Sequence, residues 1–283
     1  MNKNGGDILG LRRRLLYITN FADNTVEIYN ITNPIAPVRV GEFGAEDLSD
    51  PIALAITDTT LYVTNFADNN TVEIYDISNP TAPVRVGEFG AGDLMLPSGL
   101  AITGTTLYVT SQDNNTVEIY DITNPIAPVR VGEFGAGDLS VPAGLAITGT
   151  TMYVSNSGDN TVEIYNITNP TAPVRVDQFN EGNLDDPFSL VIIGNTLYVS
   201  NPGNDTVEIY DITNSTAPVR VGEFNANDVF GMAITGTTMY VAITLANIVQ
   251  IYDITNPTVP VPVGQFNSGN LNRPSGMAVF LTI

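Results

Sequence analysis

The stretch VEIYDITNPIAPVRVGEF, residues 117–134, decides the fold because the chain repeats it in near-copy. Six copies lie along the 283 residues, at 26–43, 72–89, 117–134, 162–179, 207–224 and 249–266. A second motif (LYV, LYI or MYV) precedes each copy, and the two motifs together contain all 12 tyrosines. A fixed period of about 45 residues indicates a repeat architecture. The tyrosines are therefore predicted to be core positions rather than ligand contacts.

Each repeat is predicted to contain four short strands, numbered here in chain order. In the third copy they are SGLAIT (98–103), TLYVTS (106–111), TVEIYDI (116–122) and PVRVGEF (128–134). These segments are rich in Val, Ile, Thr and aromatic residues, and Gly, Asn and Pro separate them. No segment has a sustained helical period, so helices should be almost absent. Four antiparallel strands in every repeat predict the blade of a β-propeller, an all-β fold.

The two ends of the chain predict how the propeller closes. The chain enters at a second strand, LLYIT (15–19), and finishes with SGMAVF (275–280), which matches a first strand. The C-terminal strand should therefore join the N-terminal blade and close a ring of six blades. DILGL (7–11) could take the same place, so the choice of closing strand stays open. We predict a leader, loose or forming an extra strand, over residues 1–14 and a single propeller domain over residues 15–283.

Composition excludes several kinds of site. The chain has no Cys and no His, so it can build no disulfide, cysteine nucleophile, Ser-His-Asp triad or His-ligated metal site. Its formal charge of −20 repels nucleic acids, and no apolar run is long enough for a membrane helix. We expect no nucleic-acid partner and no membrane insertion. The residues before the first predicted strand lack the apolar stretch of a secretory signal.

Two motifs of the repeat resemble known propeller repeats. LYVTN (61–65) resembles the YVTN repeat of prokaryotic surface propellers. ADNNTVEIYDISNPTAPVRVG (67–87) resembles the LVIVD repeat, in which a hydrophobic strand runs into Asp-Ile-Ser-Asn-Pro-x-x-Pro. The resemblance recurs in all six copies, over residues 15–283. It implies a bacterial or archaeal propeller, commonly extracellular or at the cell surface, with no defined activity.

A glutamate on the third strand and an arginine on the fourth recur in five copies. Glu118 and Arg130 lie six residues to either side of Asn124, so they should face each other directly in a hairpin without a bulge. The sixth copy replaces both, with Gln250 and Pro262. We predict a cross-strand ion pair on each outer hairpin, worth about 0–1 kcal/mol if exposed, that also discourages edge pairing. The predicted pairs are Glu27–Arg39, Glu73–Arg85, Glu118–Arg130, Glu163–Arg175 and Glu208–Arg220. The glutamate of GEF is not expected to be the partner, because the fourth copy lacks it and keeps the pair.

The loops of a propeller lie on two faces. Loops that follow the second and fourth strands share one face, and they carry most of the acidic residues that lie in loops, since the loops of the other face are nearly uncharged. We therefore predict an acidic face that contacts a cation, a protein or a small ligand. Loop carboxylates and carbonyls are the ligands that Ca²⁺ prefers, although Asp and Asn also serve turns, which is the stronger interpretation. The weak metal candidates are Asp68, Asp113, Asp159 and Asp205.

Large apolar residues that the repeat does not require occur on the same face. Clustered at the mouth of the channel they could form an interaction patch, whereas packing within the loops is the simpler explanation. They are Phe21, Phe66, Met95, Phe188, Phe230 and Leu245. The first strands, which should line the channel, carry no acidic residue, and this argues against a metal-lined catalytic channel.

These observations predict a non-catalytic binding or structural scaffold, without catalytic residues and without a cofactor other than calcium. Two alternatives stay open. One is a calcium-dependent propeller hydrolase of the lactonase type that uses Asp or Glu of the acidic face. The other is a surface subunit that assembles with copies of itself through residues 7–11.

Overall fold

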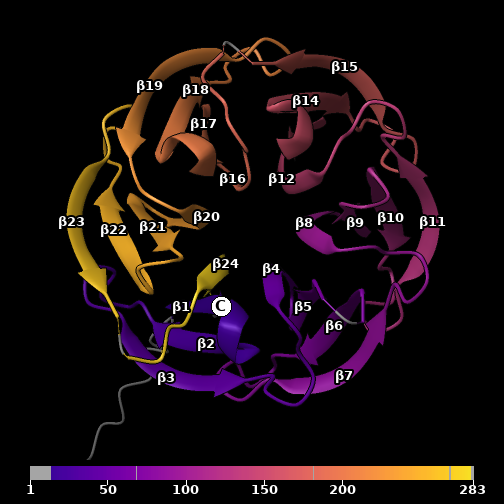
Figure 1. The fold of residues 1–283 in the computed structure, drawn as a ribbon. Coiled ribbons are helices and arrows are strands. Elements are labelled where there is room, and N and C mark those ends of the chain that lie inside the picture. Colours follow the sequence, from indigo (N-terminus) through magenta and orange to yellow (C-terminus); the bar gives the residue numbers. More distant parts are fainter. Residues whose placement is uncertain (1–13, 68, 181, 268, 282–283) are drawn as a thin grey trace, which may run out of the picture.

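The structure, a computed structural model, describes residues 14–281 except residues 68, 181 and 268. All of the predicted leader except Arg14 therefore lies outside the described residues. The described chain forms six four-stranded antiparallel sheets arranged as blades around a central axis (Figure 1). Helical structure in this part is limited to three 3-10 turns, η1 (Phe21–Asp23), η2 (Ser157–Asp159) and η3 (Pro202–Asn204). The prediction of a six-bladed β-propeller is confirmed.

Each blade runs from an inner strand at the axis to an outer strand at the rim. The blade that joins both ends of the chain contains β24 (Pro274–Leu281), β1 (Arg14–Asn20), β2 (Thr25–Asn30) and β3 (Val38–Phe43). The second and third blades contain β4 (Pro51–Thr57), β5 (Thr60–Asn65), β6 (Thr71–Asp76), β7 (Val84–Phe89), then β8 (Pro97–Thr103), β9 (Thr106–Ser111), β10 (Thr116–Asp121), β11 (Val129–Phe134). The fourth and fifth contain β12 (Pro142–Thr148), β13 (Thr151–Asn156), β14 (Thr161–Asn166), β15 (Val174–Phe179), then β16 (Leu190–Ile193), β17 (Thr196–Asn201), β18 (Thr206–Asp211), β19 (Val219–Asn225). The sixth contains β20 (Val229–Thr235), β21 (Thr238–Ile243), β22 (Ile248–Asp253) and β23 (Val261–Phe266).

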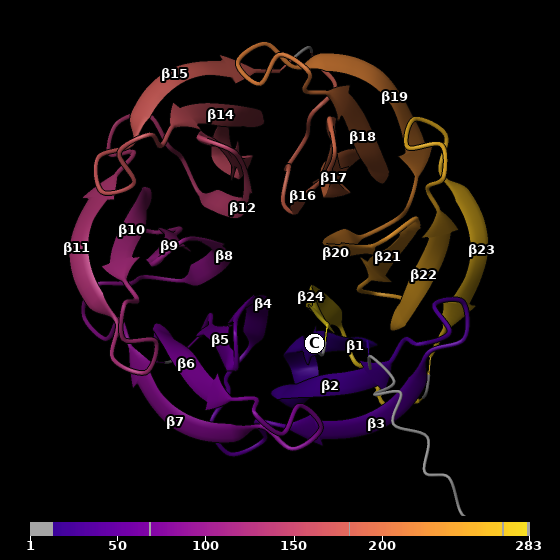
Figure 2. The same ribbon diagram turned by 180° about the vertical axis from the view of Figure 1, so that it is seen from behind.

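The C-terminal strand closes the ring. β24 pairs antiparallel with β1, from Leu15 opposite Phe280 to Asn20 opposite Pro274, and it lies innermost in that blade (Figures 1 and 2). The prediction that the C-terminal strand joins the N-terminal blade is confirmed. DILGL (7–11), the alternative closing strand, lies outside the described residues. β1 starts at Arg14, the first described residue.

The tyrosines of the repeat hold neighbouring blades together. The second-strand tyrosine of every blade donates its hydroxyl to a backbone carbonyl of the next blade at 2.7–2.9 Å; the pairs are Tyr17–Pro80, Tyr62–Pro125, Tyr108–Pro170, Tyr153–Ser215, Tyr198–Pro257 and Tyr240–Pro34. Third-strand tyrosines pack against a phenylalanine of the preceding blade, as Tyr120 does against Phe89 at 4.6 Å between ring centroids. Burial raises the pKa of Tyr108 to about 12, so its hydroxyl stays a donor at neutral pH. All twelve tyrosines are buried, in agreement with their predicted place in the core.

Inner strands approach each other closely at the axis, and glycine makes this approach possible. A Cβ added to Gly231 would lie 1.6 Å from the carbonyl oxygen of Ser275 in the neighbouring blade. A Cβ added to Gly276 would lie 1.9 Å from the carbonyl oxygen of Ile52. Both obstacles are backbone atoms of the next inner strand, so a side chain at either position would push two blades apart.

The outer hairpins contain a bulge that the sequence did not predict. Ile119 pairs with Gly132 but Tyr120 pairs with Arg130, so Val131 is an extra residue in β11. All six outer hairpins have this irregularity at the same place. The prediction that Glu118 and Arg130 face each other directly is therefore wrong, because the bulge moves Arg130 opposite Tyr120.

The five ion pairs nevertheless form, because residues diagonal to each other on one face of a hairpin are still neighbours. The Nε atom of Arg130 lies 2.6 Å from Oε2 of Glu118, and its Nη2 contacts Glu133 of GEF, so the arginine has both glutamates as partners. In the fourth blade Gln178 replaces the second glutamate and accepts from Arg175 at 2.5 Å. The corresponding pairs are Arg39–Glu27, Arg85–Glu73, Arg175–Glu163 and Arg220–Glu208.

The pairs are not exposed in the way that the sequence suggested. The side chain of Glu118 is 2 % exposed, whereas that of Arg130 is 35 % exposed. Burial raises the pKa of Glu118, and the hydrogen bonds and charge of Arg130 and the hydroxyl of Thr116 oppose that rise. The arginine is therefore needed mainly to neutralise a buried carboxylate, which makes its loss more costly than the loss of a surface pair.

We predict that Gly231→Ala destabilises the protein by about 3 kcal/mol, because the new methyl group meets the Ser275 carbonyl. Gly87→Ala is the control, since a Cβ there has its nearest neighbour at 3.8 Å. Urea unfolding followed by circular dichroism measures both variants. Equal midpoints for the two would contradict the close approach of the inner strands.

We predict that Arg130→Leu costs about 3–5 kcal/mol at neutral pH, because it leaves Glu118 buried without its partner. The loss should shrink as the pH falls toward the ordinary pKa of glutamate, since a group with a raised folded-state pKa favours the folded state when protonated. The double variant E118Q/R130P copies the sixth blade and should cost less than Arg130→Leu alone. Thermal unfolding between pH 4 and pH 8 measures this, and a pH-independent loss would refute the role given to Glu118.

Candidate functional site

Loops after the second and fourth strands meet on one face of the ring, as predicted. In the third blade the backbone N–H of Gln112 donates to the carbonyl of Leu96, and in the fourth that of Ser157 donates to Val141, both at 3.3 Å. The loop after the second strand of each blade contains an Asn or Asp with a left-handed backbone. The side-chain oxygen of this residue accepts a backbone N–H from the segment that leads into the inner strand of the next blade. The Asn and Asp residues of these loops thus serve turns and join successive blades.

The predicted metal candidates do not come together. Asp113, Asp159 and Asp205 lie in the loops of three different blades, and Asp68 lies outside the described residues. Asp159 accepts from Asn156 at 3.3 Å, and Asp205 accepts the N–H of Asp228 at the same distance. Within the part of the chain that the structure describes, no group of three or more His, Cys, Asp or Glu side chains could hold a metal ion.

Four of the six predicted patch residues line one pocket at the mouth of the channel. Phe21, Phe66, Phe188 and Phe230 are half-buried there, with a cavity of about 210 Å³ between them. The rings of Phe188 and Phe230 meet edge to face at 5.0 Å between centroids. The pocket, called the mouth pocket below, is completed by Ile52, Gln112, Thr244, Arg273 and Ser275.

The other two predicted patch residues lie elsewhere. Met95 is 44 % exposed in a loop of the third blade and does not line the mouth pocket. Leu245 is 65 % exposed and borders a separate groove with Gln250 and Pro262, where the sixth blade lacks the Glu–Arg pair. The loop that enters this blade is three residues shorter than its counterparts.

Arg273 is the cation of the mouth pocket, and its backbone is fixed from two sides. Its N–H donates to Oδ1 of Asn247 at 2.7 Å, and its carbonyl accepts the N–H of Phe21 at 3.2 Å. Its guanidinium carbon lies 4.8 Å from the centroid of the Phe21 ring, within the range of a cation–π contact. No carboxylate among the described residues lies within ion-pair distance of this guanidinium, unlike those of the five outer arginines.

The polar side chains of the pocket floor already have partners. Gln112 donates to Ser98 at 3.1 Å, Thr244 donates to the carbonyl of Pro274 at 2.7 Å, and Ser275 is 2.9 Å from the hydroxyl of Thr19. All three are buried. Arg273 is therefore the polar group of the pocket that remains available for a ligand.

The mouth pocket takes its residues from three positions of the repeat. The position after the second strand supplies Phe21, Phe66, Gln112 and Thr244; the second residue of the inner strand or its equivalent supplies Ile52, Phe188, Phe230 and Ser275; and the left-handed residue before the inner strand supplies Arg273. These positions differ between copies, whereas the strands around them hardly change. Aligning the six copies by these positions would have found the residues that the search for unusual apolar side chains missed, namely Ile52, Gln112, Thr244, Arg273 and Ser275.

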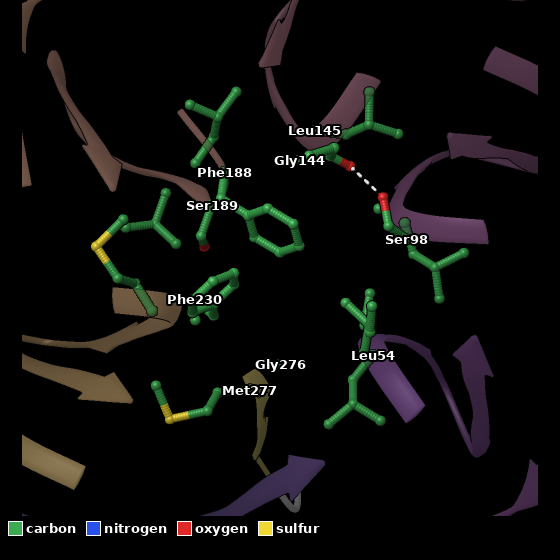
Figure 3. A pocket seen from close by; sticks show the side chains of 18 residues that line it. Leu54, Ser98, Gly144, Leu145, Phe188, Ser189, Phe230, Gly276 and Met277 are labelled. Carbon is green, nitrogen blue, oxygen red and sulfur yellow. Dashed lines mark hydrogen bonds between the residues drawn. The ribbon is translucent and has the colours of Figure 1, made fainter. Parts of the chain in front are cut away.

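Below the mouth pocket lies a narrow apolar channel of about 140 Å³. Inner-strand residues such as Leu54, Leu145 and Met277 line it, and none of its lining residues is charged (Figure 3). Phe188 and Phe230 point into its centre and belong to both cavities. The first strands of the blades thus line the channel, as expected, and its described lining residues include no acidic side chain.

No helix in the part of the chain that the structure describes is long and apolar enough to span a membrane. No curated protein matches the sequence. Among solved structures, a periplasmic gluconolactonase from Pseudomonas aeruginosa matches with a TM-score of 0.70 at 12% identity, over 94% of this chain and 85% of that one. A Bacteroides fragilis protein provisionally named a 6-phosphogluconolactonase matches with a TM-score of 0.68 at 12% identity, over 96% and 99% of the two chains.

A chain of a nidogen–laminin complex also matches, with a TM-score of 0.72 at 15% identity, over 94% of this chain and 98% of that one. At such identities the likeness shows the fold alone. The lactonase names among the neighbours contradict the prediction of a non-catalytic scaffold and favour its lactonase-like alternative. The family model of the LVIVD repeat matches residues 61–90, as the resemblance implied. The chain is a six-bladed β-propeller that carries an LVIVD repeat.

Proposed function

We propose that the protein is a lactonase-type hydrolase that binds its substrate in the mouth pocket. The observation that carries the proposal is Arg273, which has no ion-pair partner among the described residues and is held at the rim of an aromatic cavity in a strongly acidic protein. The pocket is concave and largely apolar with one convergent charge, which is typical of a small-molecule site. Solved lactonase structures that share the fold support the same class of reaction.

The guanidinium of Arg273 would act on the lactone carbonyl. Water adds to the carbonyl carbon, the negative charge of the tetrahedral intermediate develops on the oxygen, and a guanidinium beside it stabilises that charge. The ring C–O bond then breaks, the ring oxygen takes a proton, and a hydroxy acid results. No carboxylate is among the described residues of the pocket, and the chain has no His. We therefore attribute the acceleration of the reaction to substrate binding and to stabilisation of the negative charge by Arg273.

The residues do not fit a calcium-dependent version of this reaction. No acidic residue is among the described residues that line the channel and mouth pocket, and the described acidic loop residues form no cluster suited to a metal. Hydrolysis that proceeds through the residues above needs no metal ion.

We predict slow but enzyme-dependent ring opening of small lactones, measured by acid release in weakly buffered solution with EDTA or with added Ca²⁺. Arg273→Met should lower kcat/KM by at least about tenfold, because the donor to the developing oxyanion is lost. Arg14→Met is the control, since it removes the same charge at the far end of β1 from Phe21. Rates equal to buffer alone for every lactone, or an unchanged rate in Arg273→Met, would refute the proposal.

We further propose that the protein lies outside the cytoplasm, as the name of the periplasmic gluconolactonase from Pseudomonas aeruginosa indicates for that protein. Fractionation of the native host, with an antibody against the propeller, checks this location. Recovery of the protein with cytoplasmic markers would contradict it.

A further inference from the structure

The walls of the mouth pocket favour a flat apolar ligand. Phe66, Phe188, Phe230 and Ile52 present carbon atoms to the cavity, and the buried polar side chains of the floor already donate to structural acceptors. A polyhydroxylated ligand would lose its hydrogen bonds to water and find few replacements, which opposes its binding. A ring with few polar atoms would instead bury apolar surface against the phenylalanines.

The size of the pocket limits the ligand to about one ring. An engineered apolar cavity of about 150 Å³ binds benzene. The mouth pocket has about 210 Å³. It therefore accommodates an aromatic ring with a short substituent or a second small ring, and its edge-to-face Phe188–Phe230 pair offers a wall suited to such a ring.

The charge at the rim determines how that ring is oriented. The backbone of Arg273 is held by Asn247, and its guanidinium already stacks on the Phe21 ring before any ligand arrives, so less conformational freedom is lost when it pairs with an oxygen of the ligand. A ligand with one carbonyl or carboxylate beside an aromatic ring would place the ring among the phenylalanines and the oxygen at the guanidinium.

We infer that the substrates are lactones fused to or carrying an aromatic ring, and that polyhydroxylated sugar lactones are not. The hydrolytic part of this inference rests on the proposed function, whereas the binding preference rests on the pocket alone. Hydrolysis of such a lactone gives an aromatic hydroxy acid, and the carboxylate of this product would form an ion pair with Arg273.

The test compares dihydrocoumarin with glucono-1,5-lactone as substrates, and their products, 3-(2-hydroxyphenyl)propanoate and gluconate, as ligands in isothermal titration calorimetry. The aromatic acid should bind at least about tenfold more tightly than gluconate. Arg273→Met should weaken its binding by at least about tenfold through loss of the charged hydrogen bond. Phe188→Leu, which keeps an apolar side chain but removes the ring, should weaken it several-fold, and Arg14→Met should leave it unchanged.

Gluconate binding as tightly as the aromatic acid, or neither acid binding, would overturn the inference. Binding of the aromatic acid without turnover of dihydrocoumarin would refute the proposed function and leave the ligand class standing. Faster turnover of glucono-1,5-lactone than of dihydrocoumarin would refute the inferred substrate class and leave the proposed function standing. Thermal unfolding of each variant, compared with the wild type, separates loss of the site from loss of the fold.

Discussion

Pairing of β24 with β1 is the contact on which the rest of the molecule depends. It turns a row of blades into a ring and removes the exposed sheet edges that an open array would have at each end. It also builds the mouth pocket, because Phe21 follows β1 directly and Arg273 precedes β24 directly. The cation and the aromatic ring that it stacks on are thus brought together from opposite ends of the chain by closure itself.

Within the closed ring, constant and variable positions of the repeat have different tasks. The constant tyrosines, the outer phenylalanines and the loop Asn residues connect each blade to the next by the same contacts all around. The glycines at the axis allow the inner strands to approach closely. The mouth pocket is built instead from positions that vary between copies, so its chemistry can change without disturbing the scaffold. This division explains how a nearly sixfold protein acquires a single asymmetric site.

Much of the fold could be predicted because the repeat is strict. The strand pattern, the number of blades and the closing strand all follow from six aligned copies and the incomplete copies at the two ends. The register of the Glu118–Arg130 pair could not be predicted, because Val131 bulges out of β11 and moves Arg130 along the hairpin. Spacing about a turn gives the register only when both strands are regular, and nothing in the letters VRVGEF indicates the extra residue.

The site was predicted in part, and the reason lies in backbone geometry. Four phenylalanines were found because large apolar residues are unexpected in acidic loops, and the structure brings them together. Arg273 was not among the predicted site residues, because its place depends on a left-handed backbone and on ring closure. Leu245 was grouped with them, but the structure places it at a separate groove with Gln250 and Pro262.

The central claim is that an arginine and four phenylalanines at the mouth of the ring form a site for an aromatic lactone. A crystal structure with 3-(2-hydroxyphenyl)propanoate tests it most directly. The account predicts density for the ring between Phe66, Phe188 and Phe230, with the carboxylate at hydrogen-bond distance from Arg273. Density in the groove beside Leu245 with an empty mouth pocket would contradict it.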